Sequence, residues 1–206
     1  MSSSRISAMR QATFAAIVLG AISLPVEAAS PPVVEITSDT VTVNGIAVTP
    51  TLAKALFFKA LGEPTQFKPG VPGTAQGDSY RYDSLGLQLR TNAGEETVTD
   101  MIFWREKSSS SPREIFEGSL VVLGKKLPLE KVQHIKQTMP ELGLERKYFQ
   151  YSPVFEAIVG KWRLDVVVDI NTGVITSIGV ILQSSFCSQE RQANCFDPAA
   201  NRWRAP

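Results

Sequence analysis

The chain repeats one pattern of strand, glycine turn and helix at an interval of 79 residues. Thr40 and Ser119 each begin a run in which a hydroxyl residue and alternating apolar residues lead to a glycine. Residues 87–92 and 166–171 match at the same interval, and each leads through a glycine-containing turn into an apolar strand. Self-similarity at a fixed period constrains a fold strongly, because each copy must adopt the same local structure. The sequence therefore predicts two copies of one unit of roughly 75 to 80 residues.

Each copy is expected to contain one helix. The first is predicted over residues 50–61, where Thr49 is the N-cap, a proline takes the first helical position and Gly62 follows the last turn. The second is predicted over residues 128–138 and is also started by a proline. Apolar residues at helical spacing on the first segment indicate that it packs on one face of a sheet.

The rest of each copy is expected to form strands. Residues 63–78 are rich in proline and glycine and are predicted to form a long loop. Strands with alternating apolar residues are predicted at 33–37, 41–43, 79–82, 85–90, 98–104, 148–151, 155–159, 162–170 and 174–182. The predicted fold class is α+β, with two tandem repeats, each an antiparallel β-meander that has one helix packed on one face.

The first 28 residues are predicted to be a signal peptide. Arg5 and Arg10 precede the uncharged residues 12–24, and small residues before position 29 favour cleavage after Ala28. An uncleaved amphipathic anchor is the alternative. The apolar run is shorter than the about 20 residues that a membrane span needs, and no cysteine follows the cleavage site to carry a lipid. We therefore expect a soluble periplasmic or secreted protein with no membrane span.

The remaining chain divides at a serine-rich stretch. Residues 29–107 are assigned to the first repeat, 108–114 to a linker and 115–185 to the second repeat. The last segment, 186–206, is predicted to be a disulfide-closed loop and a C-terminal tail. Its bridge would join Cys187 to Cys195, because an exported protein meets an oxidising compartment. Two free thiols are the alternative.

The charge balance excludes several classes of protein. The 206 residues contain 21 Lys and Arg against 20 Asp and Glu, and removal of the first 28 leaves 19 of each sign. A neutral chain lacks the field that recruits nucleic acid, so no nucleic-acid partner is expected. The sequence also lacks the spacing of cysteines and histidines that marks a metal site, and we expect no metal and no cofactor.

Few residues could perform catalysis. His134 is the only histidine, lies on a predicted helix rich in Lys and Gln, and is interpreted as a solvated side chain. No nucleophile elbow, zinc-protease motif or phosphate-binding loop occurs. The chain is therefore predicted not to be an enzyme. A hydrolase built on carboxylates stays open as an alternative, although its candidates are expected on the outward polar face of strands: Asp83, Asp100, Asp165 and Asp169.

Aromatic residues are the candidate binding residues. Tyr and Trp dominate protein recognition because they bury much area at a low entropic cost. Tyr80 and Tyr82 share one strand face, and Trp203 lies in the tail between two arginines. Burial of these aromatic residues in the core is the alternative. The complete set of candidates is Tyr80, Tyr82, Tyr148, Phe149, Tyr151 and Trp203.

Three segments in this order resemble an uncharacterised bacterial exported domain family. They are residues 36–45 (ITSDTVTVNG), residues 61–64 (LGEP) and residues 82–87 (YDSLGL). The tandem helix-on-sheet layout is also similar to the beta-lactamase inhibitor protein and to small outer-membrane assembly lipoproteins, whose lipobox this chain lacks. The resemblance implies a non-enzymatic binding role in the periplasm, and it supplies no catalytic residues.

These observations favour an exported protein that binds another protein. The leading hypothesis is an immunity or inhibitor protein that neutralises a toxin or an enzyme. An envelope scaffold or outer-membrane assembly accessory is the alternative, and the carboxylate hydrolase is the third. A protein inhibitor of this kind should bury more than about 1,000 Å² in its interface.

Overall fold

The two repeats begin with the same tight hairpin. The computed structural model describes residues 30–74, 76–107, 113–149, 152–183, 196–197 and 202–203. In the first hairpin, β2 (Val41–Val43) and β3 (Ile46–Ala47) are joined by Asn44 and Gly45, whose φ angles are 50° and 75°. In the second, β8 (Ser119–Val122) and β9 (Lys125–Lys126) are joined by Leu123 and Gly124, at 52° and 77°. Two successive residues of positive φ match the twist of a two-residue hairpin.

These hairpins lie in one five-stranded sheet with β1 (Val33–Ile36) at its centre. The strand order is β3-β2-β1-β8-β9. β1 pairs antiparallel with β2 but parallel with β8. The parallel pair was not predicted, because sequence alternation gives no information about which distant strand becomes the neighbour.

Both helices begin several residues later than predicted. α1 spans Lys54–Leu61 and α2 spans Val132–Thr138. Leu52 has φ 50°, and Ala53 forms a β-bridge with Thr97, so the backbone before α1 cannot be helical. The predicted N-cap at Thr49 is therefore wrong, and its hydroxyl instead accepts the N–H of Val41 (3.3 Å).

The remaining strands form a second, eight-stranded antiparallel sheet. Its order is β10-β11-β12-β13-β7-β6-β5-β4. β4 lies inside the segment that was predicted to be a loop, which corrects that prediction. Two short 3-10 helices, η1 (Asp83–Leu85) and η2 (Pro140–Leu142), and the pair β14 (Phe196–Asp197) and β15 (Arg202–Trp203) complete the elements. The eight strands are β4 (Gln66–Lys68), β5 (Asp78–Tyr82), β6 (Leu87–Thr91), β7 (Val98–Trp104), β10 (Glu145–Phe149), β11 (Ser152–Val159), β12 (Trp162–Val168) and β13 (Ile175–Leu182).

The order of the large sheet shows the internal repeat directly. β7 and β13 pair at its centre, and β6, β5 and β4 continue on one side as β12, β11 and β10 do on the other. The same hydrogen bond closes both hairpins, from Val48 N–H to the Val41 carbonyl and from Leu127 N–H to the Leu120 carbonyl. The repeat is confirmed, and the fold is α+β with helices packed on mostly antiparallel sheets.

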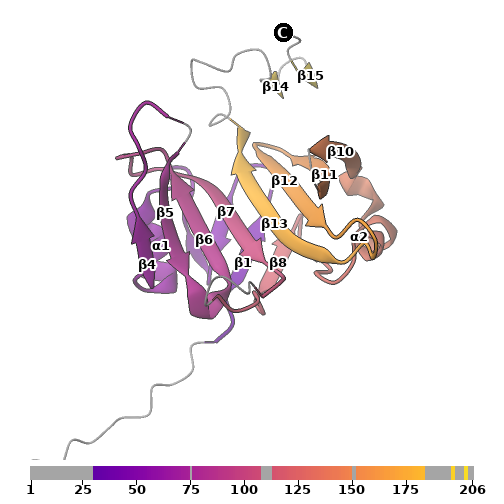
Figure 1. The fold of residues 1–206 in the computed structure, drawn as a ribbon, viewed down its shortest axis with the longest axis horizontal. Helices are drawn as coiled ribbons and strands as arrows, with labels where there is room; N and C mark the ends of the chain where they lie inside the picture. The colour runs from indigo at the N-terminus through magenta and orange to yellow at the C-terminus, as the bar shows by residue number, and fades with distance from the viewer. Residues whose placement is uncertain are drawn as a thin grey trace, which may run out of the picture. The chain divides into compact units, whose positions relative to one another are not determined.

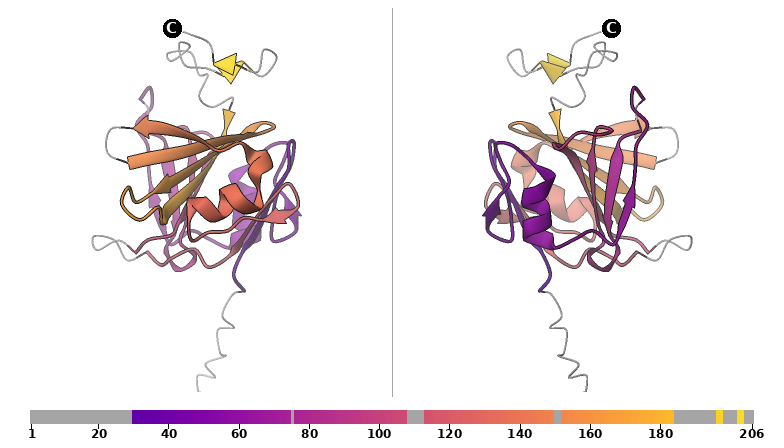
Figure 2. Two further views of the ribbon diagram at one scale, coloured as in Figure 1. Left: turned by 90° about the vertical axis from the view of Figure 1, so that its right-hand side faces the viewer. Right: turned by 90° about the vertical axis from the view of Figure 1, so that its left-hand side faces the viewer.

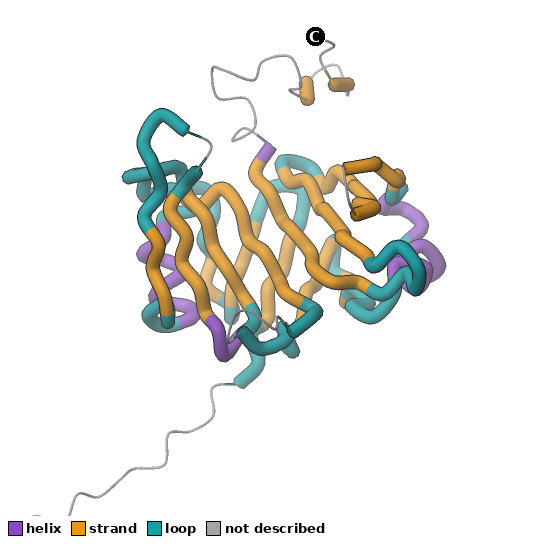
Figure 3. Tube along the Cα trace, in the orientation of Figure 1, coloured by secondary structure: helices purple, strands orange, loops and turns teal. Residues whose placement is uncertain are grey.

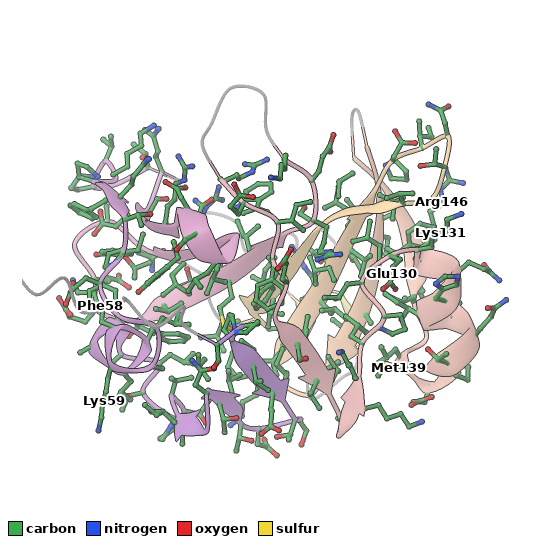
Figure 4. All side chains as sticks on the ribbon, turned by 90° about the horizontal axis from the view of Figure 1, so that it is seen from below. Phe58, Lys59, Glu130, Lys131, Met139 and Arg146 are labelled. Atoms are coloured by element: carbon green, nitrogen blue, oxygen red, sulfur yellow. The ribbon has the colours of Figure 1, made fainter. Side chains whose placement is uncertain are left out.

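The two helices and the five-stranded sheet lie on one side of the eight-stranded sheet (Figures 1 and 2). The tube view separates the broad layer of strands from the helices at its two ends (Figure 3). Seen from below, Phe58 and Lys59 of α1 lie at one end, and Lys131 and Met139, which flank α2, lie at the other (Figure 4). The repeats share both sheets, so each repeat contributes half of one structure.

The core fills the space between the two sheets. It contains alternate side chains of the large sheet, such as Phe103, and the apolar faces of β1, β2 and β8. Phe57 of α1, Ile135 of α2 and Phe116, which precedes β8, are fully buried in it. Burying each such side chain contributes about 1.5–3 kcal/mol to the free energy of folding. In the described residues, no helix is long and apolar enough to cross a membrane.

Candidate protein-binding surface

One face of the eight-stranded sheet points away from the core. We call it the outer face, and no helix or strand of the described residues covers it (Figures 1 and 2). Strand side chains alternate between the two faces of a sheet, so the register assigns each residue to a face. The outer face carries Gln66, Lys68, Ser79, Arg81, Gln88, Arg90, Asp100, Ile102, Trp104, Glu145, Lys147, Val154, Glu156, Ile158, Arg163, Asp165, Val167, Ser177, Gly179 and Ile181.

Apolar residues run across the middle of the outer face. Ile102 of β7 and Ile181 of β13 belong to the central strand pair, and Ile158 of β11 is 37% exposed. Val154 and Val167 continue the apolar surface toward the β10 edge. The solvated face of an antiparallel sheet is normally polar. Ile181 and Val154 are each only 8% exposed, so Ile158 is the member of this run that is open to contact with another molecule.

Gly179 lies at the centre of the outer face and is buried by its neighbours. It lies in the register row that joins Ile102 of β7 to Asp165 of β12. A Cβ built at this position would lie 3.5 Å from the Asp165 Cβ and 3.7 Å from the Ile181 Cδ1, which are ordinary contacts. The fold of the chain does not need a glycine here, although glycine weakens a strand interior. Such a glycine often marks a place where another backbone approaches closely.

A cluster of charged residues lies beside Gly179. Arg163 Nη2 donates to Asp165 Oδ2 (2.8 Å), and Glu156 is the cross-strand neighbour of Asp165. Arg163 and Glu156 are each only 8% exposed. Asp100 of β7 accepts the hydroxyl of Thr99 (2.7 Å). Charged side chains are thus packed closely together on a face that no described element covers.

Burial raises the pKa of all three carboxyl groups in this cluster. Loss of water raises the pKa of Asp100, of Asp165 and of Glu156, and the nearby Arg163 partly opposes the rise in each case. One oxygen of Asp165, Oδ1, is buried without a hydrogen-bond partner. The outer face is therefore already partly dehydrated at its centre, which lowers the cost of covering it with a partner.

Charge is divided unevenly between the two repeats. Each of β4, β5 and β6 places one basic residue on the outer face: Lys68, Arg81 and Arg90. Each of β10, β11 and β12 places one acidic residue there: Glu145, Glu156 and Asp165. Arg163 and Lys147 offset part of this second group, through ion pairs to Asp165 and Glu145. We call β4–β6 the basic half and β10–β12 the acidic half.

Trp104 extends the face at the end of β7. The Arg113 guanidinium carbon lies 3.7 Å from the centroid of the Trp104 ring, a cation–π contact. Arg113 and Glu114 lie at the end of the predicted linker 108–114, and Glu114 N–H donates to the Asp83 carbonyl (2.8 Å). Asp83 in turn accepts Arg81 at 2.5 Å. This edge therefore combines an aromatic ring with fixed charges.

The two tyrosines predicted to bind a partner lie in the core. Tyr80 is 5% exposed and Tyr82 is 2% exposed, since both side chains of β5 point toward the helices. Phe58 packs edge-to-face on Tyr80, and Phe67 stacks on its other side. The alternative interpretation of these residues, burial in the core, is the one that the structure shows, and neither ring can face a partner.

The other predicted binding residues cannot be placed on a surface. Tyr148 and Phe149 belong to β10 and Trp203 belongs to β15, but their side chains lie outside the described residues, as does Tyr151. Residues 1–28, Cys187 and Cys195 also lie outside the described residues. The signal peptide and the disulfide therefore stay predictions.

The candidate catalytic residues have structural or solvent-exposed positions. His134 is exposed on α2. Asp169 accepts the hydroxyl of Thr172 (2.8 Å) and the N–H groups of Thr172 (2.8 Å) and Asn171 (3.0 Å), and these bonds fix the turn between β12 and β13 and lower the pKa of Asp169. Among the described residues, no three His, Cys, Asp or Glu side chains gather so that they could hold a metal ion.

Of the four predicted acidic candidates, two lie on the outer face and two do not, since Asp83 begins η1 and Asp169 lies in the turn after β12. Asp100 and Asp165 lie on the outer polar face, as the alternation predicted. Gly179 and Ile181 were not singled out, although a glycine inside an apolar strand was the available signal. Their proximity to Asp100 depends on the pairing of β7 with β13, which joins the two repeats.

A family model matches half of the chain. Residues 33–137 match the family described as "Domain of unknown function (DUF7738)", and the chain belongs to this family. The match extends from β1 to α2 and so includes all the strands and the helix of the first repeat and the start of the second. No curated protein matches the sequence.

Solved structures give only distant likenesses. A DUF4309 family protein (YjgB) from Bacillus subtilis subsp. subtilis str. 168 is 11% identical with a TM-score of 0.39, over 63% of this chain and 78% of that one. An extracellular protein containing a SCP domain from Bacillus anthracis str. Ames is 12% identical (TM-score 0.42), over 69% of this chain and 46% of that one. A cysteine-rich secretory protein (SAV1118) from Staphylococcus aureus subsp. aureus Mu50 is 10% identical (0.41), over 68% and 46%. Likenesses of this size carry no argument about function.

Proposed function

We propose that this member of the DUF7738 family is an exported, non-enzymatic protein that binds another protein through the outer face of its eight-stranded sheet. The observation that carries the proposal is the composition of that face. Ile102 and the 37% exposed Ile158 lie among partly dehydrated charged groups, next to the buried Ile181 and Gly179. Protein interfaces combine apolar and polar groups on one surface.

The class of partner follows from what the face offers. It is a broad and nearly continuous surface, which suits a folded protein better than a small ligand, since small ligands bind in concave pockets. Immunity and inhibitor proteins act by covering a toxin or an enzyme in this manner. The layout similar to the beta-lactamase inhibitor protein supports the same class. We therefore propose neutralisation of a toxin or enzyme as the role.

The proposed compartment is the periplasm. The N-terminal pattern of Arg5, Arg10 and an uncharged stretch before Ala28 supports export. A bridge between Cys187 and Cys195 would form in the same compartment. Thiol counting on the exported, unreduced protein should find no free thiol, and two reactive thiols would contradict the bridge.

Capture with surface variants tests the proposal. Full-length protein with an affinity tag is expressed in a bacterial host that encodes it and recovered from the envelope fraction. We expect one protein to co-purify in stoichiometric amount with the wild type. Ile158→Glu should lose that partner, because an unpaired charge would be buried in the interface.

A matched control keeps the result specific to this face. Leu123, in the β8–β9 turn, is 45% exposed and lies in the other sheet. Leu123→Glu makes the same chemical change away from the outer face and should retain the partner. Equal loss in both variants, or no stoichiometric partner for the wild type, would contradict the proposal.

An envelope scaffold is the second candidate from the sequence, and deletion of the gene tests it. Deletion of the gene would then change the composition of the outer membrane. A neutralising protein predicts instead that the deletion makes cells sensitive to one toxin or leaves one enzyme unchecked, while the membrane composition stays the same.

A further inference from the structure

Three acidic side chains lie in one cross-strand row of the acidic half. Glu145 of β10 is opposite Glu156 of β11, and Glu156 is opposite Asp165 of β12. Side chains directly opposite each other in an antiparallel pair have their Cβ atoms about 4.5–5.5 Å apart, and like charges at such positions destabilise the pair. The next residue in the row is Gly179, which contributes no side chain. The fold therefore holds three carboxyl groups together against their mutual repulsion.

The basic neighbours pair only with the two ends of this row. Lys147 Nζ lies 2.9 Å from a Glu145 oxygen, and Arg163 Nη2 donates to Asp165 Oδ2 (2.8 Å). In the described part of the chain, no group donates a hydrogen bond to Glu156 or forms an ion pair with it. Asp165 Oδ1 also has no hydrogen-bond partner there. The unused acceptors therefore belong to two residues that are directly opposite each other.

Burial makes the unpartnered Glu156 a feature that needs an explanation. Glu156 is only 8% exposed, and buried polar groups in folded proteins nearly always have hydrogen-bond partners. Its carboxylate oxygens are not among the fully buried polar atoms, so its charged end still reaches the surface of the outer face. No helix or strand of the described residues covers this face. The donor that Glu156 lacks is therefore expected from another molecule.

We propose that Glu156 and Asp165 together bind an arginine side chain of the protein partner. This inference rests on the proposed function and names the chemistry of the partner. A guanidinium suits two neighbouring carboxylates, because its planar fork presents five N–H donors and its hydrogen bonds to carboxylates are strong.

Ile158 supplies the apolar part of the same site. It lies two residues from Glu156 on the same face of β11 and is 37% exposed. The methylene stem of an arginine packs on apolar surface while its charged head reaches a polar group. Arginine is also enriched among the residues that carry most of the binding energy of protein interfaces.

A titration with a small arginine compound tests the site without the partner. The full-length protein is titrated with N-acetylarginine amide and, separately, with N-acetylcitrulline amide, which has nearly the same shape but no charge. In two-dimensional NMR, the amide signals of Glu156 and Asp165 should shift in a saturable manner with the arginine compound only. Glu156→Gln should abolish the shift. No saturable shift in the wild type, or the same shift in the variant, would overturn the inference.

Stability and binding should change in opposite directions in Glu156→Gln. The midpoint of thermal unfolding should rise by about 2 °C, because the variant removes the repulsion within the row. Capture of the envelope partner should weaken about tenfold or more, since the arginine of the partner would lose its charged acceptor. Glu35→Gln, at an exposed position on β1 of the other sheet, is the matched control and should change neither. Loss of stability together with loss of the partner would show that Glu156 serves the fold, and would overturn the inference.

The outcomes separate this inference from the proposed function. Capture of the partner by Glu156→Gln with wild-type affinity would overturn the arginine site and leave the proposed function standing. A wild type that binds the arginine compound but captures no protein would support the arginine site and contradict the proposed function.

Discussion

The two faces of the eight-stranded sheet share the same strands but differ in what covers them. Phe103, on the inner face, is fully buried between the sheet and the layer of helices and small strands. One position along, Ile102 and Trp104 point to a face that no described element covers. The inner face is completed by the chain itself. The outer face is equally extensive but lacks a partner within the described part of the chain.

The two faces also differ in the surroundings of a carboxylate and in the direction of its pKa shift. Asp78, at the start of β5, points inward, and its two oxygens accept the N–H groups of Gly70 (2.7 Å) and Gly94 (3.1 Å). These bonds lower its pKa. Asp100 on the outer face is half-buried, and loss of water is the largest influence on it and raises its pKa. Both oxygens of Asp78 accept hydrogen bonds, whereas the Asp100 carboxylate retains a desolvation cost that a hydrogen-bond donor of a partner would reduce.

The largest effect should come from the inner face. Phe103→Ala removes a ring that packs edge-to-face on Phe116 at 4.8 Å, and it should lower the free energy of unfolding by about 3–5 kcal/mol. Urea denaturation measures this change. Val174→Ala, at a 40% exposed position, is the control and should cost little. Similar losses in the two variants would show that the inner face is not the core.

The next effect should come from the outer charge cluster. Arg163→Met leaves the Asp165 and Glu156 carboxylates without their closest cation, and it should lower the free energy of unfolding by about 1–3 kcal/mol at neutral pH. The loss should shrink as the pH falls and these carboxyls become protonated. The double variant Arg163→Met/Asp165→Leu should recover much of the stability. A loss that does not depend on pH would contradict the electrostatic explanation.

The two carboxylates should respond to pH with opposite signs. Because the pKa of Asp100 is raised from its ordinary 3.8, the folded state is penalised above that value, and Asp100→Asn should add about 1 kcal/mol at neutral pH. Because the pKa of Asp78 is lowered, Asp78→Asn should lose about 1 kcal/mol at neutral pH. Both differences should fade in acid: that of Asp100→Asn as pH falls through the raised pKa, that of Asp78→Asn through the lowered one. Thermal unfolding as a function of pH measures both, and equal signs would contradict the contrast between the faces.

The smallest effect should come from Gly179. The Cβ added by Gly179→Ala makes only ordinary contacts, so the variant should raise the free energy of unfolding by about 0.5 kcal/mol through the lower backbone entropy of the unfolded chain. Chemical denaturation of the isolated chain, under conditions in which it is monomeric, provides the measurement. A clear loss of stability would mean that the fold itself requires glycine there.

Local chemistry in the sequence predicted much of the fold. The repeat, the hairpin at Asn44–Gly45 and the strand alternation on β5 to β7 all depend on neighbouring residues, and they were confirmed. The helix start at Thr49 was wrong, because the bridge between Ala53 and Thr97 joins residues far apart in sequence. β4 was not predicted, because its three residues lie in a segment whose many glycines and prolines are typical of a loop.

The candidate surface was harder to predict than the fold. Tyr80 and Tyr82 were candidate binding residues because they are aromatic and share one face of a strand. Alternation alone does not say which face of that strand is covered, and both rings are buried. That depends on the hairpins and helices packing on the same side of the sheet. Gly179 and Asp100 become neighbours in space only because β7 of the first repeat pairs with β13 of the second. No local sequence pattern predicts that pairing.

Site-specific photo-crosslinking in the native host tests the central claim most directly. A photoreactive phenylalanine derivative at Ile158, on the outer face, is compared with the same residue at Leu123, on the β8–β9 turn. If the outer face binds a protein, irradiation should give a discrete cross-linked species from position 158 and none from position 123. No cross-link at 158, or the same species from both positions, would contradict the claim that this face is a binding surface.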